Sequence, residues 1–249
     1  MIHTLQMASR TCYATTGKFV QIKTLAQAKR HTGGGLQIVS KMPGYCYAIP
    51  ARNCKVGAKL REIAGSTCAS CYAFEGFYKV YANSIDRAQA ARLASLGDTL
   101  WVESMAFLIN HYCRDPEFWP SGKAKRKTKA LRGTYFRWHH SGDIQSIDHL
   151  RAIVAVVAAT PNVTHWIPTR EYAIVAKYRA IYGEFPSNLT VRLSAHMVDG
   201  DAPSGYGLPT STVTTNHDAT CPAPTQGNAC GDCRACWSPD VADVSYGLH

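Results

Sequence analysis

Short strand-like runs alternate with longer helix-like stretches along this chain, and that alternation constrains the fold more than any other feature. We expect strands at residues 44–49, 134–140, 163–167, 189–193 and 212–215. We expect helices at residues 85–111, 147–159 and 169–182. Strands separated by helices of about 10 to 15 residues indicate parallel βαβ units. The pattern predicts one α/β domain over residues 1–249, built as a TIM-like parallel β/α barrel, complete or incomplete, in preference to a doubly wound sheet.

Polar side chains gather where these expected strands end. The barrel core would span residues 40–220, and barrel enzymes build their sites from the loops that follow the strands. The candidate catalytic residues are His139, Asp143, Arg170 and Glu171, and Arg137 and His196 are expected to line the same face. His140 would point away from His139, because neighbouring strand residues face opposite sides. For Asp143 the alternative is a capping role in a Ser-Gly-Asp turn.

Four cysteines near the C-terminus have the spacing of a metal-binding loop. Three of them repeat at every third residue, and a Cys-Pro pair lies nine residues before the first. This is the composition of a bacterial-ferredoxin cluster site, with the Cys-Pro placed before the run instead of after it. Zinc sites more often use two CxxC pairs set apart by a longer spacer. We expect the loop at residues 221–237 to bind a [4Fe–4S] cluster, with zinc or disulfides as alternatives, through Cys221, Cys230, Cys233 and Cys236.

A second group of cysteines, Cys54, Cys68 and Cys71, follows the first expected strand. Four thiolates saturate a cubane cluster, whereas three leave one iron open to a substrate or cofactor. Cys46 or a histidine would supply a fourth ligand and leave no open iron. Alternatively, the three cysteines bind a structural metal or are ordinary thiols. The two groups form either two centres or one shared site at the barrel mouth. The remaining thiols, Cys12 and Cys113, have no partner spacing and are expected to be buried and free.

Cysteine usage and the N-terminal residues bear on the compartment. The N-terminus has no charged segment followed by an apolar one, and no apolar run approaches the ~20 residues of a membrane span. Ten cysteines in a chain without an export signal favour metal or redox chemistry over disulfides. We therefore expect a cytoplasmic protein with no membrane partner. The sequence leaves the oligomeric state open.

Four short motifs occur together in one known group of proteins. They are Cys68-Ala-Ser-Cys71-Tyr72-Ala73, Gly142-Asp143, Cys221-Pro222, and the run from Cys230 to Trp237. On these motifs, which cover roughly residues 40–237, the chain resembles the phage-encoded proteins of the "gene product 88" type. It is distantly similar to radical S-adenosylmethionine enzymes, which carry three cluster cysteines after their first barrel strand. The resemblance implies a barrel with an iron–sulfur cluster, in the cytoplasm of a phage host.

One departure from the radical enzymes bears on the cofactor. Their compact CxxxCxxC motif is absent, because thirteen residues separate Cys54 from Cys68. This spacing counts against S-adenosylmethionine as a second cofactor.

The net charge of 27 − 17 = +10 suggests an anionic partner, either nucleic acid or a small molecule. Six of the ten residues from 123 to 132 are basic, and such a run is either a nucleic-acid contact or a solvated surface. These residues are Lys123, Lys125, Arg126, Lys127, Lys129 and Arg132. Two hypotheses follow for the function. The first is a redox or radical-type iron–sulfur enzyme, and the second is a non-enzymatic nucleic-acid-binding protein that a cluster or zinc stabilises.

Overall fold

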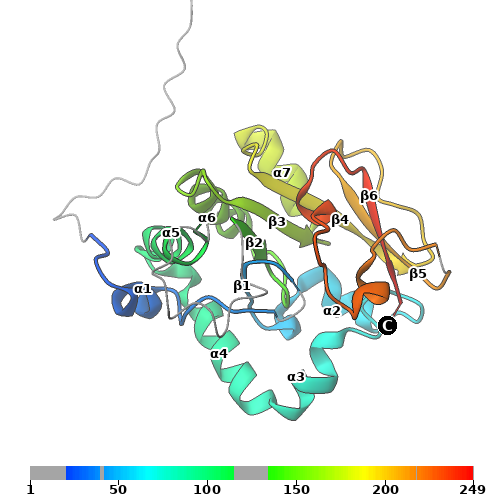
Figure 1. The fold of residues 1–249 in the computed structure, drawn as a ribbon, viewed down its shortest axis with the longest axis horizontal. Coiled ribbons are helices and arrows are strands. Elements are labelled where there is room, and N and C mark those ends of the chain that lie inside the picture. Colours follow the sequence, from blue (N-terminus) through cyan, green and yellow to red (C-terminus); the bar gives the residue numbers. More distant parts are fainter. Residues whose placement is uncertain (1–20, 40–41, 115–133, 217, 249) are drawn as a thin grey trace, which may run out of the picture.

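A single open sheet of six parallel strands organises the computed structural model, which describes residues 21–39, 42–114, 134–216 and 218–248 (Figure 1). The strands lie side by side in chain order. They are β1 (Tyr45–Tyr47), β2 (Tyr135–Trp138), β3 (Thr164–Thr169), β4 (Leu189–Val198), β5 (Thr210–Thr214) and β6 (Asp243–Gly247). β1 and β6 do not pair with each other, so the sheet does not close. The expectation of a parallel α/β fold is confirmed, and closure into a barrel is not.

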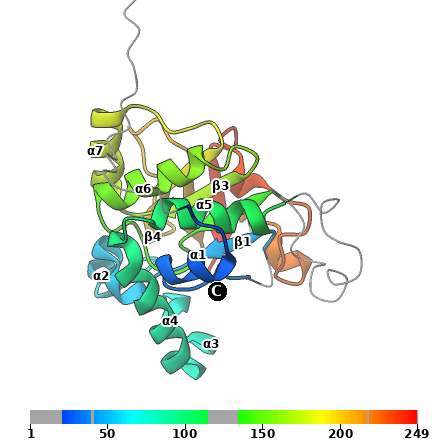
Figure 2. The ribbon, with the colours of Figure 1, turned by 90° about the vertical axis from the view of Figure 1, so that its left-hand side faces the viewer.

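Three of the described α-helices cover one face of this sheet: α5 (Trp101–Tyr112), α6 (Ile147–Ala158) and α7 (Tyr172–Tyr182). The other α-helices of the described residues are α1 (Leu25–His31), α2 (Lys55–Arg61), α3 (Gly76–Val80) and α4 (Ala82–Ala94). Figures 1 and 2 show α5, α6 and α7 packed along the same side of the strands, while α3 and the start of α4 project from the body. Within the described part of the chain, no helix is both long and apolar enough to cross a membrane.

The single helix expected at residues 85–111 is instead two helices, α4 and α5. A short 3₁₀ turn, Ser95–Gly97, ends the first helix. The Asp98 carboxylate then accepts a hydrogen bond from the Leu100 amide at 2.8 Å, just before α5 begins. An aspartate side chain that binds the main-chain amide two residues further on favours a turn over a continued helix. The apolar pattern runs through both helices, and therefore the pattern alone did not predict the break.

The face of the sheet under α5, α6 and α7 forms the apolar core. Alternate strand residues point to it, as the two-residue repeat of a strand requires. The side chains it contributes are fully or almost fully buried: Tyr47, Phe136, Trp138, Ile167, Val191 and Leu193. They pack against apolar residues of the covering helices, among them Trp101, Leu150 and Ile153. Burial of this surface supplies the main driving force for folding.

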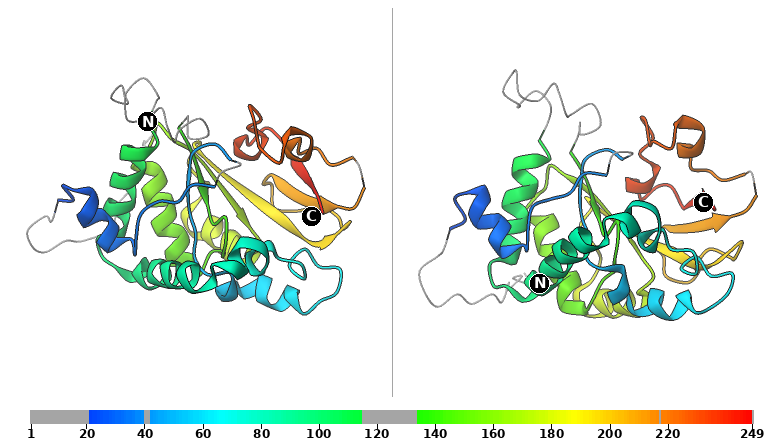
Figure 3. Two further views of the ribbon diagram at one scale, coloured as in Figure 1. Left: turned by 60° about the horizontal axis from the view of Figure 1, so that its bottom comes forward. Right: turned by 90° about the horizontal axis from the view of Figure 1, so that it is seen from below.

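The opposite face of the sheet is polar and aromatic. The strand register places Cys46 beside Arg137, and Arg137 beside Trp166. Further along the same face, Ser194 of β4 lies beside Ser211 of β5, and their hydroxyl oxygens are 3.0 Å apart. Among the described residues, no long helix covers this face. It is instead bordered by α2, by the segment that follows α2, and by the C-terminal segment, which Figure 3 shows at the end of the sheet remote from α1.

The expected strands at 44–49, 134–140, 163–167, 189–193 and 212–215 correspond to β1 to β5. The sixth strand, β6, lies beyond the cysteine loop and was not predicted. Its sequence, Asp-Val-Ser-Tyr-Gly, contains one aliphatic residue, so it offers little strand signal. The sheet therefore extends past the expected core limit at residue 220.

Burial of His165 predicts a dependence of stability on pH. The ring is fully buried, its Nε2 lies 2.8 Å from the Thr160 hydroxyl, and burial lowers its pKa from 6.5 to about 3. The histidine therefore takes up a proton near pH 6.5 in the unfolded chain but only near pH 3 in the folded chain. The free energy of unfolding consequently decreases as the pH falls from about 6.5 to about 3. Between pH 6 and pH 4, the free energy of unfolding of His165→Phe should fall by about 1.4 kcal/mol per pH unit less than that of the parent protein. Urea unfolding at several pH values measures this difference. Equal slopes for the two proteins would contradict this account.

Candidate functional site

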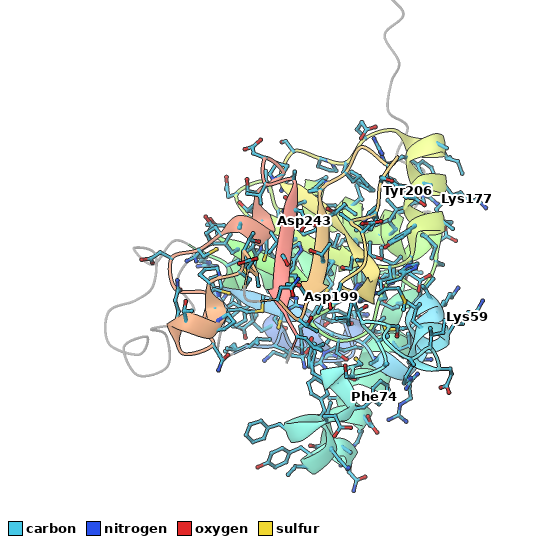
Figure 4. All side chains as sticks on the ribbon, turned by 90° about the vertical axis from the view of Figure 1, so that its right-hand side faces the viewer. Lys59, Phe74, Lys177, Asp199, Tyr206 and Asp243 are labelled. Atoms are coloured by element: carbon cyan, nitrogen blue, oxygen red, sulfur yellow. The ribbon has the colours of Figure 1, made fainter. Side chains whose placement is uncertain are left out.

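A cavity of about 540 Å³ opens on the polar face, at the carboxyl ends of the strands. Figure 4 shows the direction of the strands: Asp243, at the start of β6, lies away from α2, whereas Asp199, just after β4, lies toward Lys59 of α2 and Phe74. The walls come from the segment between β1 and α3, the loop after β2, strands β3 to β5 and the end of β6. The position agrees with the expectation that the site lies in the loops after the strands.

The three-cysteine group, Cys54, Cys68 and Cys71, lines this cavity. Burial raises the pKa of the Cys54 thiol, and the nearby Asp143, Cys71 and Cys68 raise it further. A methyl group added at Gly57 would lie 3.5 Å from the Cys68 sulfur and 3.7 Å from the Cys54 sulfur. The two sulfur atoms therefore border one small space beside the first turn of α2, and the glycine keeps that space open.

Glu171 holds the start of α2 in place. Its Oε1 atom accepts hydrogen bonds from the backbone amides of Lys55 and Val56, at 3.1 and 2.9 Å. These are two of the amides that the first turn of a helix leaves unpaired, and a carboxylate is a favourable partner for them. Because Cys54 is the residue immediately before α2, the buried Glu171 side chain constrains the backbone that carries this thiol. Glu171 was expected to be catalytic, but it does not line the cavity and has this capping contact.

Asp143 joins the loop after β2 to the end of β3. Its carboxylate accepts hydrogen bonds from the Thr169 hydroxyl at 2.6 Å and from the amides of Arg170 and Ile144 at 2.9 and 2.7 Å. Burial nevertheless raises its pKa to about 6. The capping role considered from the sequence therefore describes its contacts well. Asp143 also lines the cavity, so a role toward a ligand stays a prediction.

The turn before Asp143 is tightly constrained. Gly142 has φ +80°, and a Cβ atom there would come within 2.6 Å of the Ile49 carbonyl oxygen. His139 has φ +52°, which is uncommon for a residue with a side chain. This conformation interrupts the strand alternation, and the His139 ring lies 5.2 Å from the ring of His149 on α6. His139 borders the cavity, and burial holds its pKa well below the usual range, so the ring is neutral.

Two arginines also border the cavity, each close to one cysteine group. Burial raises the pKa of Cys68, and Arg170 partly offsets that rise; its Nε also donates a hydrogen bond to the Ala195 carbonyl at 3.2 Å. Burial likewise raises the pKa of Cys230 and Cys236 of the C-terminal loop, and Arg137 partly offsets the rise there. A positive charge next to a thiol favours the thiolate, which is the form that binds metals. Both arginines were expected at this face.

The C-terminal loop is attached to the polar face by Arg192 of β4. This fully buried guanidinium donates hydrogen bonds to four main-chain carbonyls at 2.6 to 3.1 Å: those of Thr210, Val241, Ala235 and Ser238. Trp237 adds a second anchor, because its indole nitrogen donates to the Phe136 carbonyl at 3.0 Å. These contacts hold the loop that carries Cys233 and Cys236 against the sheet.

The four cysteines of this loop are neighbours. Burial raises the pKa of Cys230 to about 11, and Cys236, Cys221 and Cys233 each raise it further. The Cys236 sulfur lies 3.1 Å from the hydroxyl of Tyr246 on β6, and Tyr246 lines the cavity. The C-terminal group therefore lies behind Tyr246, while the three-cysteine group faces the cavity directly. The structure describes two groups of thiols on one face of the sheet.

All nine cysteines of the described residues are free. In that same part of the chain, no three His, Cys, Asp or Glu side chains are placed closely enough to hold one metal ion. The thiols of each group are thus near one another without converging on a single point. A cubane cluster takes each thiolate on a different iron, so it needs ligands spread around a larger body. The donor type of both groups, thiols throughout, fits such a cluster.

Other expected site residues are elsewhere or outside the described residues. His196 stacks on Tyr172 and borders a smaller hollow next to β4. Cys113 is buried and free as expected, and Cys46 is buried too. Cys12 and the basic run at residues 123–132 lie outside the described residues.

Arg192 and Tyr246 were not recognised as site residues from the sequence. Arg192 did carry a signal, since a charged residue between Val191 and Leu193 in an apolar strand requires buried partners. Tyr246 carried none, because the strand that holds it was not predicted.

Comparison with protein families places the cysteine motifs in one group. The model of the family described as "Gene product 88" matches residues 8–239, which include both cysteine groups. No match was found among curated proteins or among solved structures. The resemblance to gene product 88 proteins is thus confirmed, and similarity to radical S-adenosylmethionine enzymes is not shown.

Loss of Arg192 should loosen the C-terminal loop. The Arg192→Leu variant leaves four carbonyls without their donor, and we expect a loss of about 3 kcal/mol in the free energy of unfolding. We also expect faster reaction of Cys233 and Cys236 with a thiol reagent, followed by mass spectrometry. Arg179→Leu, which removes an arginine on α7, serves as the control for general loosening. Unchanged thiol reactivity in Arg192→Leu would show that the loop is held by other contacts.

Loss of the Glu171 cap should free the first turn of α2. In Glu171→Ala the amides of Lys55 and Val56 lose their acceptor, so Cys54 should alkylate several-fold faster in metal-free protein. Glu171→Gln keeps a side-chain oxygen and should stay close to the parent. Equal alkylation rates in all three proteins would refute the positioning role.

Proposed function

The chain belongs to the gene product 88 family, and from this premise we propose that it is an iron–sulfur protein whose C-terminal loop binds a [4Fe–4S] cluster. The ligands would be Cys221, Cys230, Cys233 and Cys236. The observation that carries the proposal is that four free thiols lie near one another in a loop that Arg192 and Trp237 attach to the sheet. Fixed backbone around the ligands is what a metal centre requires of its protein.

We further propose a redox or radical-type enzyme with its substrate in the cavity of the polar face. Cys54, Cys68 and Cys71 would hold a second, three-thiolate centre there, with one coordination position left for a ligand. Its supports are the free sulfurs around the space beside Gly57 and the position of all three residues in the cavity wall. The alternative is that these thiols hold only a structural metal, or no metal.

The protein's own groups would have distinct roles in such an enzyme. Arg137 and Arg170 would offset negative charge on the two thiolate groups, and Glu171 would hold Cys54 in position. Asp143 would keep the loops after β2 and β3 together. A bound cluster supplies one-electron transfer. Tyr246 stands between Cys236 and the cavity, so the path from the C-terminal centre to a substrate would be short.

Two finer points belong to the same proposal. An open parallel sheet in chain order is the arrangement expected of an incomplete β/α barrel, and we propose that description for this fold. We leave S-adenosylmethionine cleavage out, because the spacing between Cys54 and Cys68 departs from the compact motif of the enzymes that perform it. Zinc remains the alternative metal for either group.

The second candidate function, nucleic-acid binding by a metal-stabilised protein, rests on the net charge and on the basic run. Since the run is outside the described residues, no contact in the structure favours it over the first. It stays a prediction from the sequence, as does a host-cytoplasmic location.

Anaerobic purification tests the C-terminal centre. We expect a brown protein with broad visible absorbance and with iron and acid-labile sulfide, as thiolate-bound clusters have. Cys233→Ser should lose most of the absorbance due to this loop. Cys113→Ala, which alters a buried thiol with no role in either group, is the matched control and should retain the full iron content. One equivalent of zinc and no iron in anaerobically purified protein would contradict the proposal.

The triple variant Cys54→Ala, Cys68→Ala, Cys71→Ala tests the second centre. If two clusters are present, the iron content should fall by about half and the electron-spin signal of the reduced protein should lose one component. Unchanged iron and an unchanged signal would leave only the C-terminal centre.

A further inference from the structure

We propose that the cavity of the polar face binds a small molecule by an oxyanion, a carboxylate or a phosphate, held by the guanidinium of Arg137 and the imidazole of His140. This inference rests on the proposed function, because it names the class of ligand that would bind in the same cavity. Arg137 and His140 would bind that ligand directly, whichever metal the cysteines hold.

Arg137 is placed on the cavity wall in a fixed plane. The strand register sets it between Cys46 and Trp166, and its guanidinium carbon lies 4.6 Å from the centre of the Trp166 ring. Its Nη1 atom donates to the Met42 sulfur at 3.0 Å, which is a weak acceptor. Its Nε atom is shut off from solvent and has no hydrogen-bond partner. A planar, stacked guanidinium with an unused donor is suited to a carboxylate or phosphate.

In the metal-free protein, the described residues around Arg137 include no carboxylate that pairs with it. The groups that act on it are the tyrosines Tyr72 and Tyr246 and the thiols Cys46 and Cys236, which are uncharged when protonated. Among the described residues, no carboxylate forms an ion pair with it. The nearest candidate on the cavity wall, Asp143, already accepts three hydrogen bonds from other groups. A cation removed from water without a counter-ion is costly, so an anionic ligand would stabilise the site.

His140 gives a second, independent indication of a ligand. It follows Arg137 by three residues, lines the same cavity and is 9 % exposed. Its Nδ1 atom is buried and has no hydrogen-bond partner. Buried polar atoms are nearly always paired in proteins, so an unpaired one in a cavity wall indicates a missing partner. A neutral imidazole N–H near a guanidinium gives an oxyanion two donors, one from β2 and one from the loop that follows it.

The size and walls of the cavity limit the ligand. A volume of about 540 Å³ admits a small molecule. The Trp166 ring and Pro168 offer apolar contact for the rest of such a molecule, on the way toward Arg170 and the three thiols. The ligand would therefore be a small carboxylate or phosphate whose other end reaches the three-cysteine group.

The test is calorimetric titration of the full chain at constant ionic strength, with inorganic phosphate in one series and malonate in another, and chloride as the reference anion. We expect saturable binding of at least one of the two, and whichever binds more tightly identifies the source of the oxyanion. Arg137→Gln should weaken binding by about tenfold or more, and Arg137→Lys by less, because a lysine keeps the charge but loses the planar fork. Arg87→Gln, on the exposed side of α4, is the matched control and should bind like the parent.

A second variant covers the case in which Arg137→Gln does not fold. His140→Phe keeps a ring of similar size and removes the N–H, and we expect it to weaken binding several-fold. Absence of saturable binding by either anion, or equal affinity in Arg137→Gln, would overturn the inference.

The cluster variant Cys233→Ser separates this inference from the proposed function. Anion binding that survives in folded Cys233→Ser protein supports an anion site made by Arg137, even if the parent holds no iron. Anion binding that disappears in folded Cys233→Ser protein would place the anion at the metal centre and overturn the inference, while leaving the cluster proposal intact.

Discussion

The buried guanidinium of Arg192 is the contact on which the arrangement of the C-terminal third depends. It donates to carbonyls from β5, from the cysteine loop and from the residues that lead into β6. One side chain therefore joins three segments that have little apolar surface of their own. Because the loop is held in this way, Cys236 comes to lie against Tyr246 and close to Arg137. Both thiol groups then share one face of the sheet, the face that also holds the cavity.

The division of the sheet into two faces explains why a cavity exists there at all. The side under the helices takes Phe136, Trp138 and other apolar residues, and it is filled. The alternate residues, such as Arg137 and Ser194, cannot form a second apolar core. An all-parallel sheet normally has both faces covered. Here the second cover consists of short segments rich in cysteine and glycine, which leave a hollow between them.

Much of the fold was predictable from the sequence, and the parts that were not share a physical cause. Helix α6 and strand β4 were predicted from their apolar residues, and β5 from a run of Thr and Val residues that is typical of strands. The break before α5 depends on a hydrogen bond of the Asp98 side chain, and the failure of the sheet to close depends on which distant strands pair. Neither feature produces a periodic pattern of apolar residues in the sequence. The cysteine groups were found because their spacing is local. The cap that Glu171 provides was not, because its partners lie 115 and 116 residues away in the chain.

The segment that enters the cysteine loop also covers the free edge of the sheet. The amide of Cys221 donates to the Ser245 carbonyl of β6 at 2.9 Å, and the Thr220 hydroxyl accepts from the Ser245 amide at 2.9 Å. An uncovered edge strand is a template for pairing with another chain, and it leads to aggregation. Release of this loop would thus uncover the main-chain groups of β6 in the same event that frees Cys221. The contacts that hold this loop therefore also shield the edge of β6 from pairing with another chain.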